Sequence, residues 1–146
     1  MNKKILVSVI VVICIIGVVS IFIIGPLSND VDNNFNQKVT VRGIPFHIPE
    51  EYILSENSDD TSFSRYIYTK DSSTIGIVVY EKYFSEDYRE ITENKSVTID
   101  TKIGGYYGYK FIDSGMATFC FEKNDKFVVV GVSHTNYEEQ ITNIIK

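Results

Sequence analysis

The side chains that most often carry out acid–base or nucleophilic chemistry are few and scattered in this chain. His47 and His134 are its only histidines, and Cys120 has no histidine near it in the sequence. General-base, metal and thiolate chemistry each need several groups that converge on one point. We therefore expect both histidines to be structural and Cys120 to be a small buried residue. The sequence predicts no catalytic residue, no metal ligand and no cofactor.

Carboxylates are more numerous, but they form no recognisable motif. Glu50-Glu51 and Asp59-Asp60 are adjacent pairs, and neighbouring side chains of an extended chain point apart, so neither pair predicts an acid–base dyad. The stretch 30–34, Asp-Val-Asp-Asn-Asn, matches the first half of a calcium-binding loop. The match fails at Phe35, where the loop needs glycine, and at Val41, where it needs glutamate. A solvated segment is the better interpretation.

Tyrosines are unusually frequent, with ten in the chain and no tryptophan. Tyrosine combines a large contact area with a polar tip, which suits a recognition surface. It also pairs across the strands of ordinary sheets, so a purely structural role stays open. The residues that we predict as a possible binding surface are Tyr66, Tyr68, Tyr80, Tyr106, Tyr107 and Tyr109.

One further motif concerns modification. The residues Asn94-Lys-Ser match the acceptor pattern for N-glycosylation, in a loop that we expect between a helix and a strand. Asn94 is therefore a possible glycosylation site, and its use depends on the host.

The elements that must position these residues begin with an apolar segment. Residues 5–25 carry no charge and only a few small or polar side chains. As a helix they would span about 31 Å, close to the thickness of the bilayer hydrocarbon core. The run is longer than the apolar part of a signal peptide, and large residues stand where a cleavage site needs small ones. The sequence predicts a retained transmembrane helix, in contact with membrane lipid.

Charge predicts the orientation of this helix. Lys3 and Lys4 precede it, whereas Asp30 and Asp32 follow it before the next basic residue, Lys38. The positive-inside rule then places residues 1–4 in the cytoplasm and the C-terminal part outside the cell membrane. That part holds 19 acidic and 12 basic residues, a net charge of −7. Such a balance disfavours nucleic acid and anionic lipid head groups as partners.

Beyond the predicted anchor we expect a linker over residues 26–36 and one extracytoplasmic domain over residues 37–146. Alternation of apolar and polar residues predicts strands through most of this domain. The run 127–132 is apolar on both faces, which indicates a central strand. The expected strands cover 39–41, 44–48, 63–68, 75–79, 97–103, 107–111, 117–122 and 127–132.

Two helices are expected in the domain. The shorter covers residues 85–94, and the C-terminal one begins at a capping box made by Thr135 and Glu138. Its apolar stripe would comprise Tyr137, Ile141, Ile144 and Ile145. The expected fold class is therefore α+β. An N-terminal transmembrane helix is followed by a curved antiparallel β-sheet, packed by a C-terminal helix and one shorter helix.

Two motifs resemble a known family. Residues 46–52, Phe-His-Ile-Pro-Glu-Glu-Tyr, resemble the opening of small Mog1/PsbP-like domains, and residues 103–109, Ile-Gly-Gly-Tyr-Tyr-Gly-Tyr, resemble their Gly-rich aromatic hairpin. The resemblance covers most of residues 37–146. It implies a curved antiparallel sheet flanked by helices, and it extends to DcrB-like domains outside prokaryotic membranes. It implies a binding or accessory module and supplies no catalytic residue.

Together these features favour a non-catalytic binding or accessory module that the anchor holds at the outer face of a membrane, near an unknown protein or envelope partner. Two alternatives stay open. One is an envelope-associated enzyme with an unrecognised active site, and the other is a structural subunit of a membrane complex.

Overall fold

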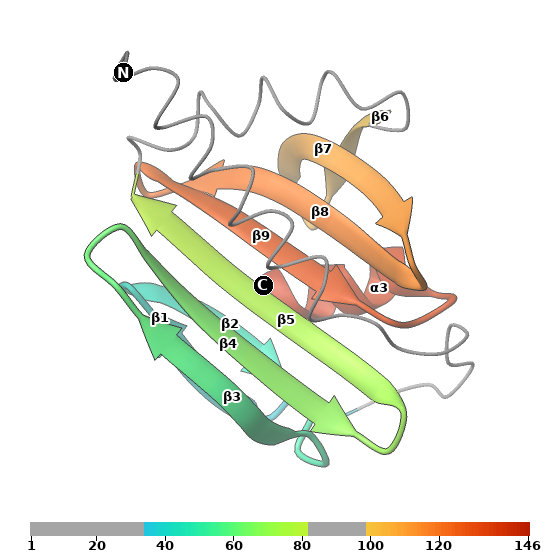
Figure 1. The fold of residues 1–146 in the computed structure, drawn as a ribbon. Helices are drawn as coiled ribbons and strands as arrows, with labels where there is room; N and C mark the ends of the chain where they lie inside the picture. Colours follow the sequence, from blue (N-terminus) through green and yellow to red (C-terminus); the bar gives the residue numbers. More distant parts are fainter. Residues whose placement is uncertain (1–33, 82–98) are drawn as a thin grey trace, which may run out of the picture.

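The computed structural model describes residues 34–81 and 99–146, which form a β-rich domain (Figure 1). Within these residues the chain forms nine strands and one helix. The strands are β1 (Gln37–Val41), β2 (Ile44–Ile48), β3 (Ile53–Asp59), β4 (Phe63–Lys70), β5 (Ser73–Glu81), β6 (Ile99–Ile103), β7 (Tyr106–Asp113), β8 (Met116–Lys123) and β9 (Lys126–Val132). The helix is α3 (Tyr137–Ile145).

Seven of the strands form one antiparallel sheet in the order β3-β4-β5-β9-β8-β7-β6, and β1 and β2 form a separate hairpin. Neighbours in the large sheet are consecutive in sequence except at the β5–β9 pair, where Ile77 lies opposite Val130. The sheet is therefore two meanders joined in the middle. β9 lies at its centre, as the apolar run predicts.

Two-residue turns set the register of several hairpins. Gly104 and Gly105 have φ values of 58° and 92°, and Asn124 and Asp125 have values of 53° and 58°. Positive φ at both central residues matches the twist of the flanking strands. The turns place Ile103 opposite Tyr106 and Lys123 opposite Lys126.

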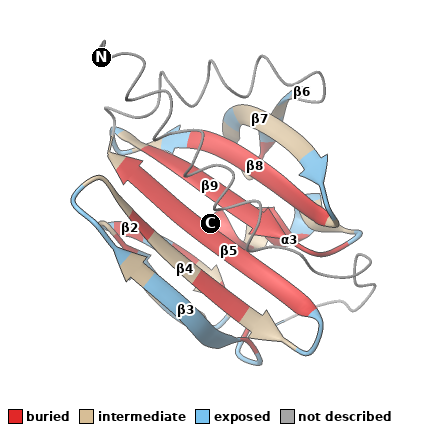
Figure 2. Ribbon diagram, in the orientation of Figure 1, coloured by how far each residue is buried: buried red, intermediate tan, exposed pale blue. Residues whose placement is uncertain are grey.

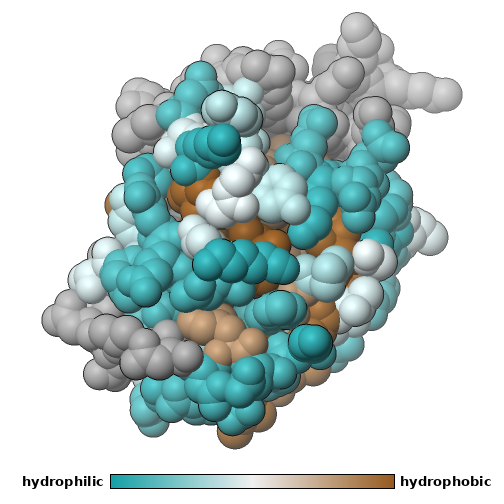
Figure 3. Space-filling model, turned by 180° about the vertical axis from the view of Figure 1, so that it is seen from behind, coloured by the Kyte–Doolittle hydropathy of each residue, from teal (hydrophilic) through white to brown (hydrophobic). Residues whose placement is uncertain are grey.

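One face of the large sheet, called here the α3 face, packs against the β1–β2 hairpin and α3, and these three parts enclose the main core. Alternate residues of the central strands point into it, and Figure 2 shows β5, β8 and β9 as the most buried strands. The fully buried side chains include Ile44, Phe46, Ile75, Ile77, Phe119, Val128, Val130, Ile141 and Ile144. Seen from the side of this layer, the surface is mainly hydrophilic, with smaller apolar areas between polar side chains (Figure 3).

The opposite face of the sheet carries a second buried apolar cluster. Its members are Val78, Tyr80, Cys120, Phe127 and Val129, with Phe63, Tyr109 and Phe111 packed beside them. Because β5 and β9 are buried on both faces, their sequences are apolar at nearly every position.

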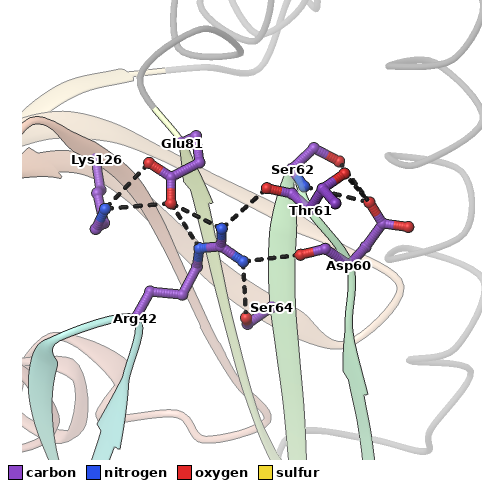
Figure 4. A network of polar contacts seen from close by, with 7 residues as sticks. All are labelled: Arg42, Asp60, Thr61, Ser62, Ser64, Glu81 and Lys126. Atoms are coloured by element: carbon purple, nitrogen blue, oxygen red, sulfur yellow. Dashed lines mark hydrogen bonds and ion pairs between the residues drawn. The ribbon is translucent and has the colours of Figure 1, made fainter.

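A network around Arg42 fastens the tip of the β1–β2 hairpin to the large sheet (Figure 4). The Arg42 guanidinium donates hydrogen bonds to Glu81 Oε1 at 2.8 Å and to the carbonyl oxygens of Asp60 at 2.9 Å and Thr61 at 3.0 Å. Lys126 Nζ donates to both Glu81 carboxylate oxygens. One side chain thus connects the hairpin to the β3–β4 turn and to the end of β5.

The expected fold class was wrong. Strands make up 65% and helix 9% of the described residues, so this part of the chain is mainly β rather than α+β with two helices and a transmembrane helix. Helix α3 is the one helix in it, and none of its helices is long and apolar enough to cross a membrane. The segments predicted as a transmembrane helix, 5–25, and as a short helix, 85–94, lie outside the described residues.

Helix α3 follows the predicted stripe. Ile141, Ile144 and Ile145 are buried, and Tyr137 packs at the margin of the core. The residue at the N-cap is Asn136 rather than the predicted Thr135, and the Asn136 side chain makes no capping hydrogen bond.

Candidate functional site

A cavity of about 630 Å³ lies at the β6–β7–β8–β9 part of the large sheet. Strand register shows that most of its lining side chains project from the face opposite α3, beside the second apolar cluster. The side chains that give it chemical character are Asp100, Lys102, Tyr107, Tyr109, Glu122 and Phe127.

Cross-strand pairing places these side chains next to one another. On β6 and β7, Asp100 lies opposite Tyr109 and Lys102 lies opposite Tyr107. On β8 and β9, Glu122 lies opposite Phe127. Directly opposed residues on one face of an antiparallel pair have Cβ atoms about 5 Å apart, which is contact distance for aromatic and long side chains. The site is therefore a mixed aromatic and charged surface built by register.

An unusually close approach between two strands supports this part of the sheet. A Cβ atom added at Gly108, in the middle of β7, would lie 2.0 Å from the carbonyl oxygen of Cys120 on β8. Only glycine allows this backbone contact. Gly108 thus brings the strand that carries Tyr107 and Tyr109 tightly against β8.

Electrostatically the site combines two carboxylates with one ammonium group. Lys102 Nζ lies 4.8 Å from the centroid of the Tyr107 ring, the geometry of a cation–π contact. Asp100, Lys102, Tyr107 and Glu122 are all exposed, whereas Phe127 is buried. Exposed charges and ring faces on a buried aromatic floor are suited to recognising a polar partner group.

The six predicted tyrosines do not share one surface. Tyr107 is 78% exposed and Tyr109 is half-buried, and both line the cavity. Tyr80 is buried in the second apolar cluster. Tyr66, Tyr68 and Tyr106 belong to the α3 face, where Tyr106 packs 4.8 Å from the Phe121 ring centroid.

Burial shows which of these tyrosines are structural. Tyr68 is 2% exposed, and burial, with a smaller contribution from Tyr66, raises its pKa to about 12. Burial also raises the pKa of Tyr66, together with the charge and hydrogen bond of Asp59. Of the six tyrosines, Tyr68 and Tyr80 are therefore buried, and Tyr107 and Tyr109 are the two that line the cavity.

The remaining chemically capable groups lie apart from one another. His134 is fully buried and hydrogen-bonded to Tyr52, and His47 is half-buried on β2. Cys120 is fully buried in the second apolar cluster, on the face of the sheet opposite α3. Among residues 34–81 and 99–146, no three His, Cys, Asp or Glu side chains gather so as to hold a metal ion.

The adjacent carboxylates have separate partners. Glu50 accepts a hydrogen bond from Asn34 at 2.7 Å, and Glu51 pairs with Lys70 at 3.0 Å. Asp60 accepts from the backbone and hydroxyl of Ser62, which lowers its pKa, and the hydroxyl of Thr61 adds to this effect. In neither pair do the two carboxylates converge on one position, as an acid–base dyad requires. Asn94 lies outside the described residues.

Comparison with protein-family models, with curated proteins and with solved structures found no match. The resemblance to Mog1/PsbP-like domains therefore depends on the two sequence motifs alone.

Sequence reasoning did not single out Asp100, Lys102, Glu122 or Phe127, although the signal was present. A two-residue turn at Gly104-Gly105 places Ile103 opposite Tyr106, so Lys102 must lie opposite Tyr107 and Asp100 opposite Tyr109. If the residue pairing of this hairpin had been derived from its turn, Asp100 and Lys102 would have been placed beside Tyr109 and Tyr107.

Proposed function

We propose that this chain is a membrane-anchored, extracytoplasmic binding module, and that its binding site is the cavity on β6–β9. The observation that carries the proposal is the cavity of about 630 Å³ itself, with exposed Tyr107, half-buried Tyr109 and two carboxylates on its walls. Binding sites typically combine an apolar floor with a few polar groups that fix orientation.

The uncharged run 5–25 supports the anchor, and the acidic balance of the residues that follow it supports a position outside the membrane. A tether keeps such a domain at high effective concentration beside other membrane-associated molecules. In this proposal the module captures or positions a protein or envelope partner and performs no chemistry on it.

Site-specific photo-crosslinking in the native cells tests the binding site. A photoreactive phenylalanine analogue at position 107 of the full chain should give a discrete adduct. The matched control carries the analogue at Ser55, which is exposed on the terminal strand β3. Equal adducts from both positions, or none from position 107, would contradict the assignment of the cavity.

Protease added to intact cells tests the orientation. The domain should be digested while a cytoplasmic marker survives, and the N-terminal fragment should stay with the membrane fraction. A domain that survives this treatment until the cells are lysed would contradict the extracytoplasmic placement.

A further inference from the structure

The ring of Tyr107, a strand residue, is largely exposed to solvent. At 78% exposure it is the most exposed of the large hydrophobic side chains in the described residues. The ammonium group of Lys102 lies over this ring at 4.8 Å. The face of a tyrosine ring attracts cations through its quadrupole, and a neighbouring lysine of the same chain uses it here.

The two carboxylates beside this ring differ from three other carboxylates of the domain. Glu81, Glu56 and Glu138 each pair with an arginine or lysine of a neighbouring element. The side-chain carboxylates of Asp100 and Glu122 have no ion pair or hydrogen bond with any of the described residues. Together with Lys102 they leave the site with a net charge of −1.

An aromatic face flanked by carboxylates is suited to a positive group that also has an apolar stem. Lysine and arginine side chains have this form, because their methylene groups can pack on rings while the charged end reaches the carboxylates. The net charge of −7 beyond residue 25 favours the approach of a basic segment. At about 630 Å³ the cavity has room for residues on either side of that side chain.

We propose that Tyr107, Asp100 and Glu122 form a recognition site for a basic side chain of a protein partner, and that Lys102 occupies the Tyr107 ring in the free protein. This inference rests on the proposed binding function and specifies its partner chemistry. Binding then exchanges one cation for another on the same ring. Lys102 acts as a built-in competitor that a correctly placed lysine or arginine must displace.

A peptide titration of the full chain in detergent micelles tests the inference. The probe is acetyl-Gly-Gly-Lys-Gly-Gly-amide, and its matched control contains norleucine in place of lysine. Peptide-observed saturation-transfer NMR should detect binding of the lysine peptide and none of the norleucine peptide. Tyr107→Ala and Glu122→Gln should each weaken binding by about threefold or more. Equal binding of both peptides would overturn the inference.

The variant Lys102→Met provides the sharper test, because it should strengthen binding of the lysine peptide by about threefold or more. Lys38→Met is its charge-matched control, since Lys38 is exposed on the β1–β2 hairpin, and it should bind as the wild type does. If Lys102→Met binds no better than Lys38→Met, the competitor role is refuted. Circular dichroism of each variant confirms that the sheet is intact.

Cross-linking separates this inference from the proposed function. A specific adduct from position 107 with no lysine-peptide binding would refute the basic partner and leave the binding module in place. Absence of the adduct would refute the module itself.

Discussion

The phenolic oxygen of Tyr52 lies 2.7 Å from Nε2 of His134, and both side chains are completely buried although they are 82 residues apart. Tyr52 follows β2, and His134 follows β9. Their hydrogen bond therefore ties the hairpin layer to the centre of the large sheet. In an interior of low dielectric such a bond is strong, and a polar group that loses its partner there is costly.

Replacing Tyr52 with phenylalanine should lower the free energy of unfolding by about 1–3 kcal/mol, because His134 Nε2 loses this buried partner. Urea denaturation followed by circular dichroism measures the change. Tyr107→Phe is the matched control, since this exposed residue should shift stability by less than about 0.5 kcal/mol. Equal losses in the two variants would show that the buried bond contributes nothing.

The Arg42 network predicts that lysine cannot replace arginine there. Arg42→Lys keeps the charge but cannot reach Glu81, Asp60 and Thr61 together, because only a guanidinium has donors in this forked arrangement. We expect a loss of about 1–2 kcal/mol in the free energy of unfolding. Lys38→Arg, on the same hairpin, is the control and should leave stability unchanged. A stable Arg42→Lys variant would contradict the role of the fork.

Glu81 predicts a pH dependence of stability. Hydrogen bonds from Lys126 and Arg42, and to a lesser extent their charges, lower the pKa of the Glu81 carboxyl group below its ordinary value of 4.5. The unfolded chain therefore takes up this proton at a higher pH than the folded chain does. The stabilisation is complete above the ordinary pKa and is lost as the pH falls through the folded value.

Between about pH 6 and about pH 3, the wild type should thus lose more unfolding free energy than Glu81→Gln. Urea denaturation at each pH measures both curves. Glu139→Gln, at an exposed position of α3, should follow the wild-type curve. Parallel curves for the wild type and Glu81→Gln would contradict this assignment.

Gly108 should tolerate no side chain. In Gly108→Ala the new methyl group would meet the Cys120 carbonyl oxygen at 2.0 Å, so β7 must move away from β8. We expect a destabilisation of about 2 kcal/mol or more and weaker binding at the cavity. Gly43→Ala is the control: its φ of 80° imposes strain of about 1 kcal/mol, but nothing lies within 4 Å of the added atom. If Gly108→Ala lost less unfolding free energy than Gly43→Ala, the close contact between β7 and β8 would not matter for stability.

Hairpins with strong local signals could be predicted from the sequence. The alternation of Ile44, Phe46 and Ile48 predicts β2, and Asn124-Asp125 predicts the turn between β8 and β9. Strand β3 was missed because almost all of its residues are exposed, so neither of its faces needs an apolar period. The α+β class was wrong because the described residues are mainly strands, with α3 as their one helix.

The proposed binding surface was harder to predict than the strands. Tyr66 and Tyr68 lie on β4 and Tyr107 lies on β7. The first two face the core layer, whereas Tyr107 faces the cavity. Which side of a strand is covered depends on the packing of β1–β2 and α3, and no local pattern contains that information.

The central place of β9 also determines when the domain can be completed during synthesis. Lys126–Val132 emerge from the ribosome after every other strand, yet they form the seam between the two meanders. Before that moment β5 has an apolar edge without its inner neighbour, and such edges template aggregation. A chain cut short ahead of Lys126 would therefore leave two separate half-sheets, so a nascent chain needs protection from aggregation until β9 has been made.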